Sequence, residues 1–449
     1  MSLAPPKHGP SLHPSHRQVL AIALPIMVSN VSTPLIGMVD TGVVGQVGDA
    51  ALIGAVAVGA LIFTFMFWAF GFLRMGTTGL TAQALGAGDD SEVRHTLGRA
   101  LVIAVAAGAF LVALQWPIRE VAFWLLDGSA RVEEFARRYF DARVWSAPAA
   151  LINYALLGWF IGRGRARVAL VLQLVLNLTN MALDALFVLE FGWGVEGVAW
   201  GTVVAEVFAA MVGLVIAYAH LRGLAGRLDV AALLDRARLG ATIAINRDIM
   251  VRSLALLFVF VFFMAEGARR GDVILAANAI LMHFISGASY FLDGLAFATD
   301  ALVGRAIGAG NRAAFRGAVR ISTGWAAAAA LAASAVCWAF GPPFIDLLTV
   351  DVASRETARE FLPWAALAPL AGVWCFQLDG VFIGATRGPE MRNAMVLSTL
   401  IFIGAWWLLL PFGNHGLWAA LFVHYAARTA TLGAYYPRVA AGLSGDDGA

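Results

Sequence analysis

Charged residues are scarce in this chain: Asp, Glu, Lys and Arg make up only 13% of its 449 residues, whereas soluble domains contain about 25%. Apolar residues make up 60% of the sequence, and the mean hydropathy is +0.77. This composition excludes a soluble domain and predicts a protein that crosses the lipid bilayer many times. The net charge is only +2 and the basic residues are spread along the chain, so we expect no nucleic-acid partner.

Cysteine is also scarce, and both copies, Cys337 and Cys375, lie in apolar runs. This excludes a disulfide or cysteine–metal framework and predicts buried, inert thiols. The sequence contains no HExxH or GxSxG motif and no plausible His/Cys/Asp metal set, which argues against an intramembrane enzyme and against a cofactor. The stretch before Arg17 lacks the apolar core of a signal peptide, so we interpret residues 1–15 as a cytoplasmic tail.

Apolar runs separated by charged or glycine-rich breaks predict an all-α polytopic membrane protein with twelve transmembrane helices in two six-helix lobes. The predicted spans are 16–45, 49–85, 95–115, 138–162, 166–189, 195–220, 238–267, 272–306, 316–340, 358–385, 392–411 and 415–438. The expected domains are a tail at 1–15, an N-lobe at 16–221, a cytoplasmic linker at 222–237, a C-lobe at 238–440 and a C-terminal tail at 441–449.

The distribution of arginine predicts the orientation in the membrane. One set of loops, which includes both termini and in which we count Arg99 and Arg428, holds about twice as many basic residues as the other, in which we count Arg143. Loops rich in Lys and Arg face the cytoplasm. We therefore expect both termini on the cytoplasmic side, in agreement with an even number of spans.

The two halves of the chain repeat. GLTAQALGAGDDSEVR at 79–94 aligns with ALVGRAIGAGNRAAFR at 301–316, and LLGWFIGRGR at 156–165 aligns with LDGVFIGATR at 378–387. Both matches have the same offset of about 222 residues without gaps, which predicts two copies of a six-span unit. Because six is even, the copies have the same orientation and are related by a pseudo-two-fold axis along the membrane normal. Such a pair of lobes suits alternating access around a central cavity.

Asp40 is the only ionisable residue between Gln18 and Gln46, within the first span. A carboxylate inside a bilayer is costly when charged and unpaired, so it usually marks an ion path or a proton relay. Pro25 and Pro34 interrupt the same span, and proline bends helices. Our interpretation is that Asp40 takes up and releases a coupling cation and that this bendable helix carries the response.

The repeat shows that the acidic side chains deep in the first and fifth spans have no acidic counterpart in the second half. At the common offset, Asp40 corresponds to Phe262, Asp184 to Trp406 and Asn180 to Phe402. Asn180 and Asp184 are four residues apart, and so are Thr202 and Glu206, so each pair shares one face of its helix.

If these faces meet Asp40, they form a polar pocket for a coupling ion. Carboxyl groups in such a pocket suit a proton, and the oxygens of Asp40, Asn180, Asp184 and Thr202 also suit Na⁺, so both ions stay open. Each of these residues, and Glu206, has a structural alternative, because polar side chains often only tie membrane helices together. In the second half, Asp293, Asp379 and Arg252 either form ion pairs or line the substrate cavity.

Five segments together resemble the MATE (multidrug and toxic compound extrusion) family, DinF branch. They are PLIGMVDTGVVG from Pro34, LRMGTTGLTAQALGAG from Leu73, INRDIMVRSL from Ile245, LDGVFIGATRGPEMRN from Leu378 and GNHGLW from Gly413. The resemblance implies a bacterial inner-membrane antiporter that exports small organic, cationic or amphipathic compounds in exchange for H⁺ or Na⁺. It implies protonation at Asp40, with Asn180, Asp184 and Thr202 as partners and Pro25 as the bending residue.

The resemblance also implies that Tyr139 and Asn153 line the N-lobe. Some branches of the family carry an acid in the seventh helix, where this chain has Ala255, so a second ion site in the C-lobe is not expected. We expect a monomer. The alternative function is a lipid or lipid-linked-sugar flippase of the same architecture. It stays open because Arg74, Arg247 and Arg252 could supply the positive charges that a pyrophosphate requires. A channel is disfavoured because no selectivity filter is recognisable.

Overall fold

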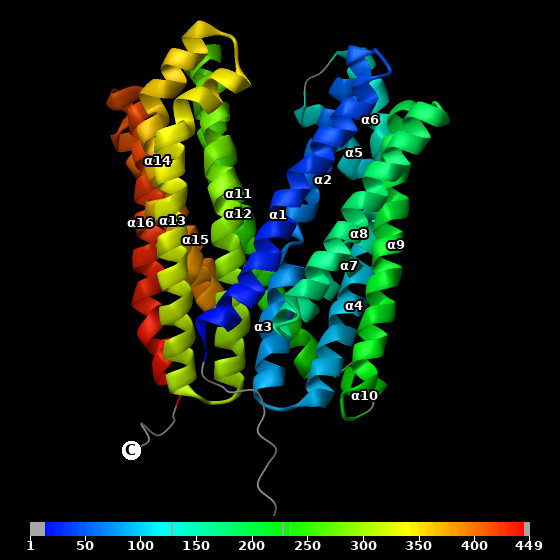
Figure 1. Cartoon of the computed structure of the whole chain (residues 1–449), viewed down its shortest axis with the longest axis vertical. Helices are drawn as coiled ribbons and strands as arrows, with labels where there is room; N and C mark the ends of the chain where they lie inside the picture. Colours follow the sequence, from blue (N-terminus) through cyan, green and yellow to red (C-terminus); the bar gives the residue numbers. More distant parts are fainter. Residues whose placement is uncertain (1–13, 127–128, 227–228, 234, 444–449) are drawn as a thin grey trace, which may run out of the picture. The chain divides into compact units, whose positions relative to one another are not determined.

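The computed structural model describes residues 14–126, 129–226, 229–233 and 235–443. Within this part of the chain all regular structure is helical (Figure 1). The α-helices are α1 (His16–Gly45), α2 (Ala50–Ala69), α3 (Phe72–Gly86), α4 (Asp90–Ala113), α5 (Gln115–Leu125), α6 (Ala130–Arg143), α7 (Ala147–Gly162), α8 (Ala166–Ala185), α9 (Gly194–Arg222), α10 (Val230–Leu233), α11 (Arg236–Arg269), α12 (Asp272–Gly308), α13 (Arg312–Leu348), α14 (Val352–Gly384), α15 (Gly388–Leu408) and α16 (Gly413–Ala441).

The predicted all-α membrane class is confirmed. In the described residues, 11 helical segments are long and apolar enough to cross a membrane, and the predicted twelfth span falls in α16, a continuous helix of 29 residues. The predicted second span is two helices, α2 and α3, separated at Phe70 and Gly71. The predicted fourth span begins earlier than expected, because α6 and α7 run together from Ala130 to Gly162.

Contacts divide the chain into two compact units. Unit 1 comprises Met1–Leu24, Ala82–Asp89 and Ala255–Ala449, and unit 2 comprises Pro25–Thr81 and Asp90–Leu254. The division cuts α1 directly before Pro25 and cuts α11 directly before Ala255. The two units are therefore not continuous along the chain, whereas the sequence predicted continuous lobes at 16–221 and 238–440. The boundaries of those lobes stay a prediction.

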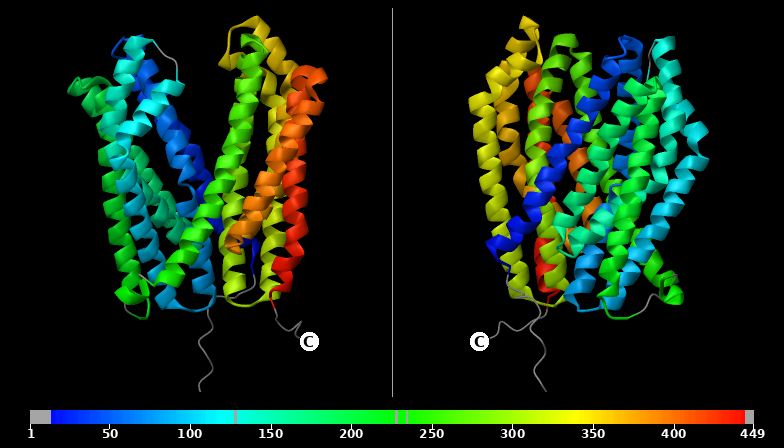
Figure 2. Two further views of the ribbon diagram at one scale, coloured as in Figure 1. Left: turned by 180° about the vertical axis from the view of Figure 1, so that it is seen from behind. Right: turned by 45° about the vertical axis from the view of Figure 1, so that its right-hand side comes forward.

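Each unit has its own apolar core. In unit 2 the core includes packed aromatic rings, with the ring centroids of Phe63 of α2 and Phe140 of α6 lying 5.2 Å apart. In unit 1, α12, α13, α14 and α16 run alongside one another (Figures 1 and 2), and the core includes Phe263 packed edge-on against Trp418. Lipid tails are as apolar as these side chains, so the hydrophobic effect does not hold membrane helices together. The contacts of the large rings instead provide van der Waals packing between the helices.

Close helix packing repeats in the two units at the offset seen in the sequence. Each of four glycines lies so near a backbone carbonyl of the neighbouring helix that an added Cβ would collide with it. The pairs are Gly158 with Arg74 and Gly162 with Thr78 in unit 2, and Gly380 with Ala296 and Gly384 with Asp300 in unit 1. Only small residues allow backbones to approach this closely, so the repeated glycines have a repeated steric cause.

A second glycine contact is reciprocal. The space for a Cβ at Gly86 of α3 is filled by the carbonyl of Arg305 in α12, and the space at Gly308 of α12 is filled by the carbonyl of Gln83 in α3. Residues 83 and 305, and residues 86 and 308, are related by the repeat offset. All four residues lie in unit 1. The GAG motif therefore serves as a crossing point at which each helix needs a glycine.

This crossing predicts that Gly86→Ala and Gly308→Ala each lower the melting temperature of the purified protein. The added methyl group meets backbone rather than a movable side chain, and overpacking of this kind costs about 1–3 kcal/mol. The matched control is Gly433→Ala on α16, where a Cβ meets no atom within 4 Å and where alanine favours the helix. Melting temperatures that do not separate the two variants from this control would contradict the packing argument.

The short helix α5 is absent from the sequence prediction. It is held to α6 by ion pairs, in which Arg119 donates to Asp141 at 2.7 Å and Arg137 donates to Glu120 at 2.7 Å. The hydrogen bond from Arg137 holds the pKa of Glu120 below its usual value. Trp124 on α5 is 81% exposed, as expected for an aromatic residue at a membrane–water interface.

The predicted linker is tied to the start of α4. The Arg94 guanidinium donates to the backbone carbonyls of Leu221 at 2.7 Å and Leu224 at 2.6 Å. Arg238, which opens α11, donates to Glu92 at 2.6 Å. These contacts within unit 2 fix both ends of the described connection.

Candidate functional site

The centre of the candidate site is a pair of buried carboxyl groups, Asp40 on α1 and Asp184 on α8. Their exposed fractions are 4% and 0%, and they lie close enough to share a hydrogen bond. Two carboxylates this close together and this poorly solvated repel each other, which favours protonation of one of them. The arrangement can therefore hold one exchangeable proton in the interior of unit 2.

Asn180 and Thr202 extend this pair. The Asn180 side-chain amide donates to Asp184 Oδ1 at 3.2 Å and to Thr202 Oγ1 of α9 at 3.1 Å. The Thr202 hydroxyl in turn donates to the carbonyl of Val198 at 3.0 Å. The structure thus brings together four of the residues that the sequence singled out, although it does not test their role.

A second contact between α1 and α8 lies about two turns away. Asn177 Nδ2 of α8 donates to Ser32 Oγ of α1 at 2.8 Å, and Gln173 donates to Asn177 at 2.8 Å. Ser32 precedes Asp40 by about as much as Asn177 precedes Asp184, so the two helices run in the same direction here. Sequence reasoning missed this contact, although Asn177 lies on the turn before Asn180.

Three buried oxygens of the site accept no hydrogen bond from the described residues: Asp40 Oδ1, Asp184 Oδ2 and Asn180 Oδ1. Unsatisfied buried acceptors are costly, so they favour a bound proton, water or hard cation. Carboxylate, amide and hydroxyl oxygens are the ligands that Na⁺ would take. The residues therefore fit either coupling ion.

Glu206 belongs to a neighbouring contact. Asn153 of α7, which the family resemblance indicated, donates from Nδ2 to Glu206 Oε2 at 2.6 Å and to the carbonyl of Glu206 at 3.0 Å. Asn153 is buried, with 7% of its surface exposed. The amide fixes the position of this third acid on α9, which is the helix that carries Thr202.

Arg143 is the counter-charge that the sequence analysis missed. We counted it as a loop residue, but it forms the last residue of α6 and interacts electrostatically with Asp40, Asp184 and Glu206. It hydrogen-bonds to the hydroxyl of Tyr139, and its guanidinium lies 5.2 Å from the centroid of the Phe63 ring. The Tyr139 hydroxyl therefore holds the Arg143 guanidinium near the acids.

Gly201 allows α9 to approach the acidic pair. A Cβ at this position would collide with Asp184 Oδ1. We expect Gly201→Ala to displace the Asp184 carboxyl and to lower transport at unchanged expression. The control is Gly287→Ala on α12, where a Cβ meets no atom within 4 Å. Wild-type transport by the Gly201 variant would show that the position of Asp184 is not critical.

Unit 1 has aromatic rings at the repeat-related positions. Phe262, the counterpart of Asp40, packs edge-on against Trp406, the counterpart of Asp184, with ring centroids 4.9 Å apart. Phe262 also lies 5.7 Å from Phe402, the counterpart of Asn180. The equivalent residues therefore meet in both units, through carboxyl and amide groups in unit 2 and through an aromatic cluster in unit 1.

Two buried charges of unit 1 form an ion pair. Asp379 of α14 accepts a hydrogen bond from Arg428 of α16, and both are almost fully buried. Arg428, which we counted as a loop residue, lies inside α16 at the position that corresponds to Glu206. Because arginine is always charged, the Asp379 carboxylate has a permanent partner.

The remaining predicted residues are placed as follows. Asp293 lies on α12, close enough to Tyr290 to interact with it electrostatically. Arg252 lies on α11 within unit 2, with 7% of its surface exposed, and its guanidinium approaches the sulfur of Met75 at 3.9 Å. Pro25 lies inside the continuous helix α1, at the first residue that belongs to unit 2.

Comparisons with known proteins find similar sequences and a similar fold. The MatE family model matches residues 25–186 and 249–412. DNA damage-inducible protein F of Escherichia coli is 40% identical over 426 residues, covering 94% of this chain and 92% of that protein. Multidrug resistance protein PmpM of Pseudomonas aeruginosa is 24% identical, covering 93% of this chain and 90% of its own. The bent form of the Vibrio cholerae MATE transporter VcmN superposes with a TM-score of 0.85 at 19% identity, covering 95% and 97% of the two chains.

Proposed function

Because this chain belongs to the MatE family, whose members are transporters and not enzymes, we propose that it is a secondary active antiporter driven by an inward flow of protons. The protein is a multi-pass bacterial inner-membrane transporter of the multidrug efflux type. Its substrates are small organic molecules. We propose in addition that they are cationic or amphipathic, that the protein works as a monomer, and that both termini face the cytoplasm.

The observation that supports proton coupling is the buried, interacting pair of carboxyl groups, Asp40 and Asp184. Among the interactions described above, Arg143 is the one positive charge near three acids, Asp40, Asp184 and Glu206. Loss of the shared proton would place two carboxylates side by side at low solvation, which is strongly unfavourable. The contacts of the pair must therefore differ between its protonated and its deprotonated state.

The response of α1 follows from its two attachments. Beyond Pro25 the helix contacts α8 through Asp40 and through Ser32, and before Pro25 it belongs to unit 1. Proline removes one backbone hydrogen bond and makes a kink inexpensive at this point. A change in the contacts of Asp40 would therefore be absorbed by bending at Pro25, which would couple protonation to alternating access.

Na⁺ is the alternative coupling ion, supported by the three unsatisfied oxygens of Asp40, Asn180 and Asp184. When bound, Na⁺ would neutralise the carboxylates, as a proton does. The aromatic cluster of Phe262, Phe402 and Trp406 offers no oxygen ligand, which supports a single coupling site in unit 2.

The test is efflux of a fluorescent organic cation from proteoliposomes with an imposed gradient of either pH or Na⁺. Proton coupling requires that a pH gradient alone drives export and that substrate addition releases protons. Export driven only by a Na⁺ gradient would show that the coupling ion is Na⁺ and not H⁺. Translocation of a labelled lipid without export of the cation would instead support the flippase alternative.

A further inference from the structure

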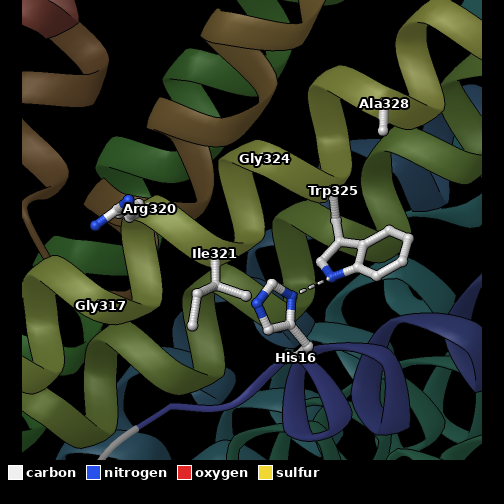
Figure 3. Close-up of a pocket in the computed structure, with 7 residues that line it drawn as sticks. All are labelled: His16, Gly317, Arg320, Ile321, Gly324, Trp325 and Ala328. Atoms are coloured by element: carbon white, nitrogen blue, oxygen red, sulfur yellow. Dashed lines mark hydrogen bonds between the residues drawn. The ribbon is translucent and has the colours of Figure 1, made fainter.

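Unit 1 contains a cavity that the proposed coupling mechanism does not use. It has a volume of about 630 Å³ and lies between the start of α1 and the first half of α13 (Figure 3). This volume is within the range of about 300–1,000 Å³ found for small-molecule sites. The cavity exists because α13 presents small residues, Gly317, Gly324 and Ala328, along one side.

The cavity lies at the level where a lipid headgroup would lie. Arg312, Arg316 and Arg320 follow one another at four-residue intervals, and no charged residue follows until Asp346. The uncharged stretch of α13 after Arg320 is about 37 Å long, enough to cross a hydrocarbon core of about 30 Å. Arg320, which is exposed, therefore marks the boundary of the hydrocarbon core on the arginine-rich side.

His16 and Trp325 complete the polar lining. The indole Nε1 of Trp325 donates to Nδ1 of His16 at 3.1 Å, as the dashed line in Figure 3 shows. Tryptophan can only donate, so Nδ1 must accept, and the proton of the neutral imidazole lies on Nε2. His16 therefore offers a second donor in addition to the Arg320 guanidinium, which lies at the other end of the group in Figure 3.

We propose that this cavity binds an acidic phospholipid of the surrounding leaflet. Arg320 binds the phosphate at one end of the cavity, His16 and Trp325 contact the glycerol region at the other end, and an acyl chain follows the apolar surface of α13. Guanidinium groups are the preferred protein partners of phosphate, and polybasic surfaces next to spans attract anionic lipids. No acidic side chain is among the described residues that line the cavity, which disfavours an organic cation as its occupant.

The test is native mass spectrometry of the full-length protein in detergent, titrated with dioleoylphosphatidylglycerol or dioleoylphosphatidylcholine. We expect the wild type to retain one phosphatidylglycerol more strongly than phosphatidylcholine. Arg320→Gln should weaken retention of phosphatidylglycerol about tenfold, because a charge-assisted bond to phosphate is lost. The control Arg438→Gln, an exposed arginine of α16 in the same unit, should leave retention unchanged.

A second pair of variants tests the cavity itself. Gly324→Leu should fill it without a clash, since a Cβ there meets no atom within 4 Å, and the same holds for the exposed control Gly404→Leu on α15. We expect only the Gly324 variant to lose the lipid. Equal retention of both lipids by the wild type, or retention by Gly324→Leu and Arg320→Gln, would overturn the proposal. Displacement of the lipid by tetraphenylphosphonium would also overturn the proposal, because it would assign the cavity to a substrate. A dimer that is lost only in the Gly324 variant would overturn it by assigning the cavity to a second copy of the chain. These readouts do not depend on transport.

Discussion

Asp40→Asn is expected to reduce gradient-driven export to the level of empty vesicles while leaving the protein folded and inserted. The side-chain amide can donate to Asp184 and so preserve the contact between α1 and α8, but it cannot release a proton. Substrate binding, measured by fluorescence quenching, should persist. The measurement is export from proteoliposomes under an imposed pH gradient at matched protein content.

The control for charge removal is Asp272→Asn, at an exposed first-turn position of α12, which should transport normally. Asp184→Asn should also lose export. Because the two carboxyl groups act as one titrating pair, the double variant should be no worse than either single variant. Normal gradient-driven export by Asp40→Asn would refute the proposed coupling mechanism.

Arg143→Gln is expected to lower export about tenfold, equivalent to about 1.4 kcal/mol of barrier, and also to lower the melting temperature. The variant leaves Asp40, Asp184 and Glu206 without their nearest positive charge, which is costly in a poorly solvated site. Protonation removes carboxylate charge, so the loss of stability should be larger at high pH than at low pH. Thermal unfolding measured across pH checks this dependence.

Two further variants separate charge from packing. Arg143→Lys keeps the positive charge but loses the planar contact with Phe63, so it should recover part of the export. Arg138→Gln is the control, because Arg138 lies on the same helix in an exposed pair with Glu134. A pH-independent loss of stability in Arg143→Gln would indicate a role in packing alone.

Much of the fold follows from sequence periodicity and repetition. Long apolar runs predict helices because a helix satisfies its backbone hydrogen bonds within a single segment inside lipid. The offset of about 222 residues predicts which positions correspond, and the structure shows that the counterparts of Asp40 and Asp184, Phe262 and Trp406, do meet. Helix spacing predicted that Asn180 and Asp184 share one face, whereas their contact with Thr202 was implied by the family resemblance. The part of these residues in coupling stays a prediction.

Other features depend on tertiary contacts that spacing does not encode. Arg143 and Arg428 were counted as loop residues although both fall inside predicted spans, and only packing shows that each lies beside buried acids. The pairing of Asn153 with Glu206 joins α7 to α9 at a distance of more than fifty positions, which no helical period predicts. The helix α5 was missed because its length and mixed polarity resemble a loop.

The reciprocal placement of Gly86 against Arg305 and of Gly308 against Gln83 has a consequence for the origin of the chain. An ancestral six-helix protein that paired with itself about a two-fold axis would have made this contact twice with identical residues, so one glycine would have met both steric requirements. Fusion of two such genes would then have freed each copy to change elsewhere. In the present chain one repeat carries carboxylates and the other carries aromatic rings at the corresponding positions, while both carry the glycine at this crossing.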